Sequence, residues 1–123
     1  MTAIRTMLAL LFASGLFASG AAALAKAPKE KTVHGAIAVN RDTRAFGYAS
    51  NSKTATDAKR EALRQCGDKK CEVVSSFKNG CAAVADDGKK LVPITGATRD
   101  EAETKVMRKC GAGCKVLAWA CTP

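Results

Sequence analysis

One segment of the sequence occurs twice, and this repetition limits the folds that the chain can adopt. Residues 59–74 read KREALRQCGDKKCEVV, and residues 103–119 read ETKVMRKCGAGCKVLAW. When Thr54 is set over Thr98, the two copies run in register at an offset of 44 residues. Each copy passes from a helical pattern through two closely spaced cysteines into a strand-like pattern. The chain therefore contains two related structural units.

Each unit contains one predicted helix with a recognisable start and end. Thr54 and Thr98 are candidate N-caps, and an acidic residue follows each of them three positions later, as in a capping box. Apolar positions then recur at helical spacing: Ala58, Ala62, Leu63 and Cys66 in the first copy, and Ala102, Val106, Met107 and Cys110 in the second. A glycine follows each closing cysteine, which is a common signal for the end of a helix.

Short apolar stretches surround each predicted helix and read as strands. HGAIAV and AFGYAS precede the first helix and EVVSSF follows it, while CAAVA, KLVPI and KVLAWA take the same places around the second. The loop between CAAVA and KLVPI contains Asp87 and Gly88, which favour a turn. The sequence thus predicts an α+β fold, in which duplicated β-β-α-β units form one antiparallel sheet with two helices packed on it.

The first 25 residues have the character of a signal peptide. Arg5 precedes an apolar run that ends in small residues, and residues 23–25 fit the small-x-small cleavage rule. A retained membrane helix is the alternative, although glycines and serines interrupt a run that is short for a membrane span. We expect export and cleavage after Ala25. The chain then divides into a signal peptide (1–25), a flexible lead-in (26–33) and a single disulfide-bonded domain (34–123) with repeats over about 34–80 and 81–121.

The cysteines all lie beyond the predicted signal peptide: Cys66, Cys71, Cys81, Cys110, Cys114 and Cys121. An even number of cysteines in a small exported domain is typical of a disulfide framework. The repeated spacing favours the pairs Cys66–Cys71 and Cys110–Cys114, which leaves Cys81 to pair with Cys121. Pairing across the repeats, such as Cys66 with Cys110, remains open.

Several of these segments resemble a known family. GAIAV at residues 35–39, NGCAAVA at 79–85, VLAWAC at 116–121 and the two Cys-Gly turns are similar to the bacterial exported domain of unknown function 4189. The resemblance covers about residues 34–121. The chain departs from the family pattern near Ser76, where a bulky aromatic residue is usual. The resemblance implies an exported, disulfide-bonded module, and it implies no settled activity and no catalytic residues.

The residues that catalysis or metal binding needs do not form a recognised motif. His34 is the only histidine, and we expect it at the solvated end of a strand. Zinc sites favour paired cysteine knuckles in a reducing compartment, whereas this chain is expected to be exported. Cys110 closes a helix, where the helix dipole disfavours the thiolate that redox chemistry would need. Asp100 and Glu101 keep an uncharacterised hydrolase as an alternative. The sequence predicts no enzyme activity, no metal site and no cofactor.

Positive charge is the remaining global signal, because 20 basic residues stand against 11 acidic ones and give a net charge of +9. If the two helices pack side by side, six basic side chains could form one anion-binding surface: Lys59, Arg60, Arg64, Lys105, Arg108 and Lys109. Such a surface would attract anionic polymers of the cell envelope. An ordinary charged exterior with strand-protecting lysines is the alternative.

The few aromatic residues complete the functional prediction. Beyond the predicted signal peptide the chain has only Phe46, Tyr48, Phe77 and Trp119, and we expect most of them in the core. The interleaved aromatics of single-strand nucleic-acid binders are absent, so no specific nucleic-acid partner is expected. We expect a small binding module that acts on a protein partner in the periplasm or outside the cell. A basic envelope protein that binds anionic polymers is the alternative.

Overall fold

The computed structural model describes residues 31–123. The predicted signal peptide and residues 26–30 of the lead-in lie outside the described residues. The elements are β1 (His34–Asn40), β2 (Phe46–Ser52), α1 (Ala55–Cys66), β3 (Cys71–Lys78), β4 (Cys81–Asp86), β5 (Leu91–Gly96), α2 (Arg99–Cys110) and β6 (Lys115–Cys121). Within residues 31–123 no helix is both long enough and apolar enough to cross a membrane.

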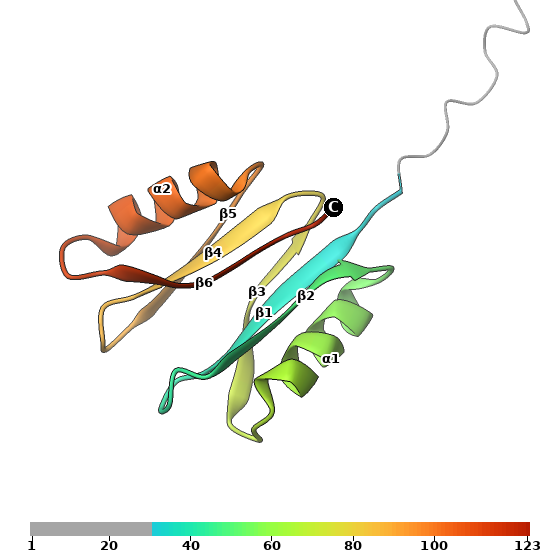
Figure 1. Ribbon diagram of the computed structural model, residues 1–123, viewed down its shortest axis with the longest axis horizontal. Helices are drawn as coiled ribbons and strands as arrows, with labels where there is room; N and C mark the ends of the chain where they lie inside the picture. The colour runs from blue at the N-terminus through green and yellow to red at the C-terminus, as the bar shows by residue number, and fades with distance from the viewer. Residues whose placement is uncertain (1–30) are drawn as a thin grey trace, which may run out of the picture. The chain divides into compact units, whose positions relative to one another are not determined.

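Each repeat folds into the predicted β-β-α-β unit, which confirms the α+β class and the duplication (Figure 1). The strands, however, form two three-stranded antiparallel sheets in place of the one sheet expected from the sequence. The first sheet has the order β2-β1-β3 and the second has the order β5-β4-β6. Each unit therefore builds its own sheet. One face of that sheet packs against the helix of the same unit, and the other face packs against the sheet of the other unit.

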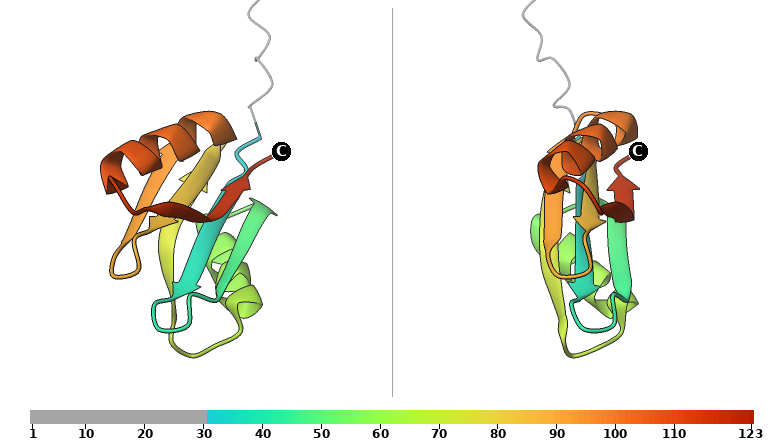
Figure 2. Two further views of the ribbon diagram at one scale, coloured as in Figure 1. Left: turned by 60° about the vertical axis from the view of Figure 1, so that its left-hand side comes forward. Right: turned by 90° about the vertical axis from the view of Figure 1, so that its left-hand side faces the viewer.

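The central strands show why two sheets form. Ile37 and Val39 of β1 pack against Val84 of β4, whereas Ala36 and Ala38 pack under α1. A strand that is buried on both faces needs a cover on each side, which a single two-layer arrangement does not provide. The result is four layers, with α1 and α2 on the outside and the two sheets between them (Figure 2).

The helices begin and end where the sequence predicts. The Thr54 hydroxyl accepts a hydrogen bond from the backbone N–H of Asp57, and the Thr98 hydroxyl accepts one from Glu101, both at 3.1 Å. Gly67 adopts φ 80°, and its N–H donates to the carbonyl of Leu63. These caps satisfy backbone groups that would otherwise lack partners at the helix ends.

Three disulfides complete the frame, and they confirm the pairing that the repeated spacing favours. Cys66–Cys71 and Cys110–Cys114 each tie the end of a helix to the start of the following strand. Cys81–Cys121 joins β4 to β6, where the two residues are partners in the strand pairing. In the chain-entropy view of disulfides, the closure of this longest loop is worth about 4 kcal/mol and each short loop about 2 kcal/mol.

The two sheets do not cover each other completely. β6 lies against β1 and β2, whereas β4 and β5 lie against β3. β2 and β6 are each the last strand of their sheet, so they meet at one open edge of the four-layer structure. Within residues 31–123 the second sheet ends at β6, and side chains of β2 on the facing side stay partly exposed.

Candidate functional site

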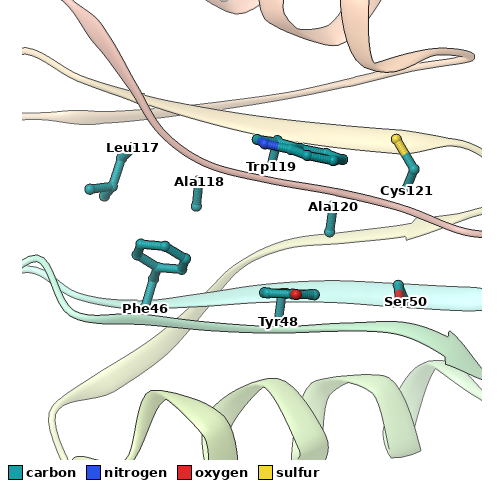
Figure 3. Close-up of a pocket in the computed structure, with 8 residues that line it drawn as sticks. All are labelled: Phe46, Tyr48, Ser50, Leu117, Ala118, Trp119, Ala120 and Cys121. Carbon is teal, nitrogen blue, oxygen red and sulfur yellow. The ribbon is translucent and has the colours of Figure 1, made fainter.

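A cleft of about 450 Å³ lies between β2 and β6 at this open edge (Figure 3). Its lining residues come from the two strands alone: Phe46, Tyr48 and Ser50 of β2, and residues 117–121 of β6. The Phe46 and Tyr48 rings stand up from β2, and Ala118 and Ala120 point down from β6 toward them (Figure 3). The cleft therefore has an aromatic floor and a roof of two alanines, with Leu117 at one end.

Strand register places the two aromatic rings in the cleft. Phe46 pairs with Val39 and Tyr48 pairs with Ile37, so both rings share the face of the sheet that carries the central core. At the position of β2 this face is only partly covered, and Phe46 and Tyr48 are 43% and 44% exposed. The alanines opposite them are too small to fill the space. Apolar surface of core type is thus open to solvent here.

Trp119 adds a third exposed ring beside the cleft. It pairs with Ala83, on the face of β6 that is turned toward α2, and it is 39% exposed. The Arg99 guanidinium lies 3.8 Å from the centre of the ring, which places a positive charge on the indole face. The expectation that most aromatic residues lie in the core is therefore wrong, because only Phe77 is buried. Edge strands carry the others.

An ion pair between the two repeats lies near one end of the cleft. Arg44, two residues before β2, donates from Nε to the Asp86 carboxylate at the end of β4, at 3.0 Å. The Asp86 side chain is 5% exposed, and its other oxygen accepts from the N–H of Gly88 at 2.8 Å. Lys115, at the start of β6, is the partner of Asp86 in the strand register. Its ammonium group forms no ion pair within residues 31–123. These three side chains, two basic and one acidic, therefore carry one net positive charge at this end of the cleft.

Comparison with known proteins places this structure in a family. The sequence profile of "Domain of unknown function (DUF4189)" matches residues 34–121, which span every strand and helix described above. The chain belongs to the DUF4189 family. This finding confirms the resemblance seen in the sequence.

Mycobacterial proteins are among the similar members. The uncharacterized protein Rv1813c of Mycobacterium tuberculosis is 41% identical over 88 residues, which cover 72% of this chain and 59% of that protein. The uncharacterized protein Mb1843c of Mycobacterium bovis matches to the same extent. The chain thus spans somewhat less than two thirds of the length of these relatives. The NMR structure of Rv1813c matches this fold with a TM-score of 0.59 and 30% identity, over 99% of this chain and 96% of that one.

The structure separates the six basic residues that were predicted to form one surface of this DUF4189 domain. Lys59, Arg60 and Arg64 belong to α1, and Lys105, Arg108 and Lys109 belong to α2. The two helices are the opposite outer layers, so the side-by-side packing on which that surface depended does not occur (Figure 1). The set divides into two smaller groups on different faces. Anion binding by either group stays a prediction.

Neighbouring carboxylates also neutralise part of each group. Arg64 hydrogen-bonds to Glu61, and this contact, with a second from Gln65, lowers the pKa of Glu61 to about 2. Lys105 pairs with Glu101 and likewise lowers the pKa of that carboxyl group. A general acid needs a raised pKa, so the environment of Glu101 does not suit the acid of a glycosidase-like pair.

The structure also shows where the remaining predicted site residues lie. All six cysteines are in disulfides, which leaves no thiolate among them for a metal or a redox reaction. His34 begins β1 and is half-buried, opposite Ser52 and Lys78. Asp100 lies on the exposed first turn of α2. Sequence reasoning missed the cleft and the Arg44–Asp86 pair, since both depend on how the two sheets overlap.

Proposed function

We propose that this DUF4189 domain is an exported binding module that acts on a protein partner through the β2–β6 cleft. The observation that carries the proposal is the pair of half-exposed rings, Phe46 and Tyr48, on a face that elsewhere forms the core. Exposed aromatic residues in a concave site are typical anchors of protein recognition. Cys81–Cys121 ties β6 to β4, and β2 pairs along its length with β1, so little conformational entropy is lost on binding.

Export remains part of the proposal. Three disulfides favour an oxidising compartment, and the apolar segment in residues 1–25 is the expected export signal. We further propose that the domain is not an enzyme. The anion-binding alternative has only the net charge of +9 in its favour, because the helices present two separate basic groups.

A pull-down tests the proposal. The oxidised protein is immobilised, exposed to an envelope and secreted extract, and washed at low and then at high salt. We expect a partner that is retained at high salt, is lost with Tyr48→Ser, and is kept with Leu63→Ser. Leu63 is the matched control because it is 38% exposed on α1, away from the cleft. Retention of polymers at low salt alone, unaffected by Tyr48→Ser, would favour the basic groups and contradict the proposal.

A further inference from the structure

The two open edges of the four-layer structure differ in their protection against strand pairing. At one edge, β5 contains the exposed Pro93 and β3 carries Glu72 and Lys78. Proline and charged side chains are the usual devices that keep an edge strand from pairing with another chain. At the other edge, β2 has no charged residue and β6 has only Lys115, at its start. The β2–β6 edge therefore carries fewer of these devices than the β3–β5 edge does.

The duplicated halves make this difference specific to the cleft. Phe46 and Tyr48 pair with Val39 and Ile37 in the first sheet. The corresponding positions of β5 hold Leu91 and Pro93, which pair with Asp86 and Val84 in the second sheet. The same architectural position thus holds two aromatic rings at one edge, and a leucine and a proline at the other.

The overlap of the sheets indicates which strand would be extended. β6 lies against β1 and β2, and among residues 31–123 no strand pairs with its outer side. A segment that pairs with the free side of β6 would continue the second sheet outward over β2. Every second side chain of that segment would then point down onto Phe46 and Tyr48. The added strand would cover the part of the core face that the second sheet leaves open.

The charge of the domain favours an acidic partner over a second copy. The chain carries a net charge of +9, so two copies repel each other. Lys115 stands at the start of β6 without an ion pair in the described part of the chain, beside the Arg44–Asp86 pair. A carboxylate at that end of a bound segment would meet an unneutralised ammonium group.

We propose that the cleft receives an extended segment of a partner protein that pairs with the free edge of β6, sets alternate apolar side chains on Phe46 and Tyr48, and directs a carboxylate toward Lys115. This inference rests on the proposed binding function and names the kind of partner. Main-chain hydrogen bonds to β6 would supply affinity, and the aromatic floor and Lys115 would supply specificity.

A random peptide library tests the inference directly. The full chain is expressed in a host that exports and processes it, so that its three disulfides form. Peptides as long as β6 are then selected for binding to this protein. We expect the enriched sequences to alternate apolar and polar residues and to carry aspartate or glutamate at one end. Failure to enrich any sequence would overturn the inference, and so would an enriched apolar spacing of three and four residues, which is typical of a helix.

Binding of the best selected peptide is then measured by the fluorescence of Trp119, the only tryptophan of the chain. Methylation of the alternate peptide nitrogens that face β6 keeps the side chains and removes the strand hydrogen bonds. We expect it to weaken binding at least about tenfold. Lys115→Glu and Tyr48→Ser should each weaken binding about tenfold, whereas Leu63→Ser should leave it unchanged. If neither of the two alternate sets of methylated nitrogens weakened binding, strand pairing with β6 would be overturned.

The same measurements separate this inference from the proposed function. If a partner were captured through Tyr48 but no extended peptide bound, the proposed binding function would be supported and the proposed strand pairing with β6 would be refuted. Light scattering over a range of protein concentrations should give a monomer. A dimer that dissociates when the selected peptide is added would refute the claim that the occupant is another protein, because a second copy of this chain would then occupy the edge of β6.

Discussion

Removal of Arg44 should destabilise the domain more than removal of any exposed charge. Arg44 is the partner of Asp86, whose side chain is 5% exposed at the junction of the two repeats. Arg44→Ala leaves that carboxylate with one donor, the N–H of Gly88. A buried ion pair that loses one member typically costs 3–5 kcal/mol, and the Arg44 side chain is 22% exposed, so water can reach the site. We expect a loss of about 3 kcal/mol.

Asp86→Asn should cost less than Arg44→Ala. The amide oxygen can still accept the hydrogen bond from Gly88, and the partly exposed guanidinium of Arg44 can turn toward solvent. We expect a loss of about 1 kcal/mol, typical of one hydrogen bond. In the Asp86→Asn background, Arg44→Ala should then cost less than about 1 kcal/mol, since no buried charge is left without a partner. The two substitutions should therefore be coupled by about 2 kcal/mol.

Urea unfolding with the disulfides intact measures these differences. Thermal melts should agree, because about 3 kcal/mol corresponds to a fall in Tm of roughly 12 °C or more for a domain of this size. The control is Arg41→Ala in the same loop, whose pair with Glu72 is exposed on both sides and is worth less than about 1 kcal/mol. If Arg44→Ala cost no more than Arg41→Ala, or if the two substitutions were additive, the Arg44–Asp86 pair would not join the repeats as argued.

Three further predictions concern the helices. Thr98→Ala should lower the free energy of unfolding by about 1 kcal/mol in urea titrations, because it removes the N-cap acceptor of α2, and unchanged stability would contradict that role. Gly47→Ala should cost about 3 kcal/mol or prevent folding, because a Cβ atom would overlap the backbone of α1 at Ala62, and circular dichroism melts would show this. Glu61 has a pKa of about 2 against an ordinary 4.5, so its ionised form stabilises the fold above pH 4.5, and this contribution is lost as the pH falls to about 2. Glu61→Gln should therefore flatten the dependence of Tm on pH between those values, and an unchanged slope would refute the assignment.

The elements of the fold could be predicted from the sequence because each one has local signals. Thr54 and Gly67 mark the two ends of α1 through their own backbone and side-chain chemistry, and the same signals recur in α2. The disulfides were predictable because the repeat fixes which cysteines are neighbours in the chain. Local chemistry of this kind does not depend on the partner against which an element packs.

The number of sheets and the place of the cleft depend on contacts between the repeats. The run from Ala36 to Val39 has no alternation, and this is the available sign of a strand covered on both faces. The alternation of Phe46 and Tyr48 with smaller residues correctly indicates one apolar face of β2, and it cannot show that the opposite sheet ends before covering that face. Asp86 could be recognised as a turn residue, but its pairing with Arg44 brings together positions 42 residues apart.

The duplication explains how a chain of this size can have both a stable core and an edge with exposed aromatic rings. Two units of the same plan bury their central strands against each other, and this leaves two similar edges, one at β2 and β6 and one at β3 and β5. The core does not need both edges to be the same, because the central strands and the inner faces of the two helices carry its fully buried side chains. Side chains at the edges can therefore differ at little cost in stability. Pro93 disfavours strand pairing at one edge while Phe46 and Tyr48 remain exposed at the other, so side chains can differ between the edges without disturbing the frame that both halves build.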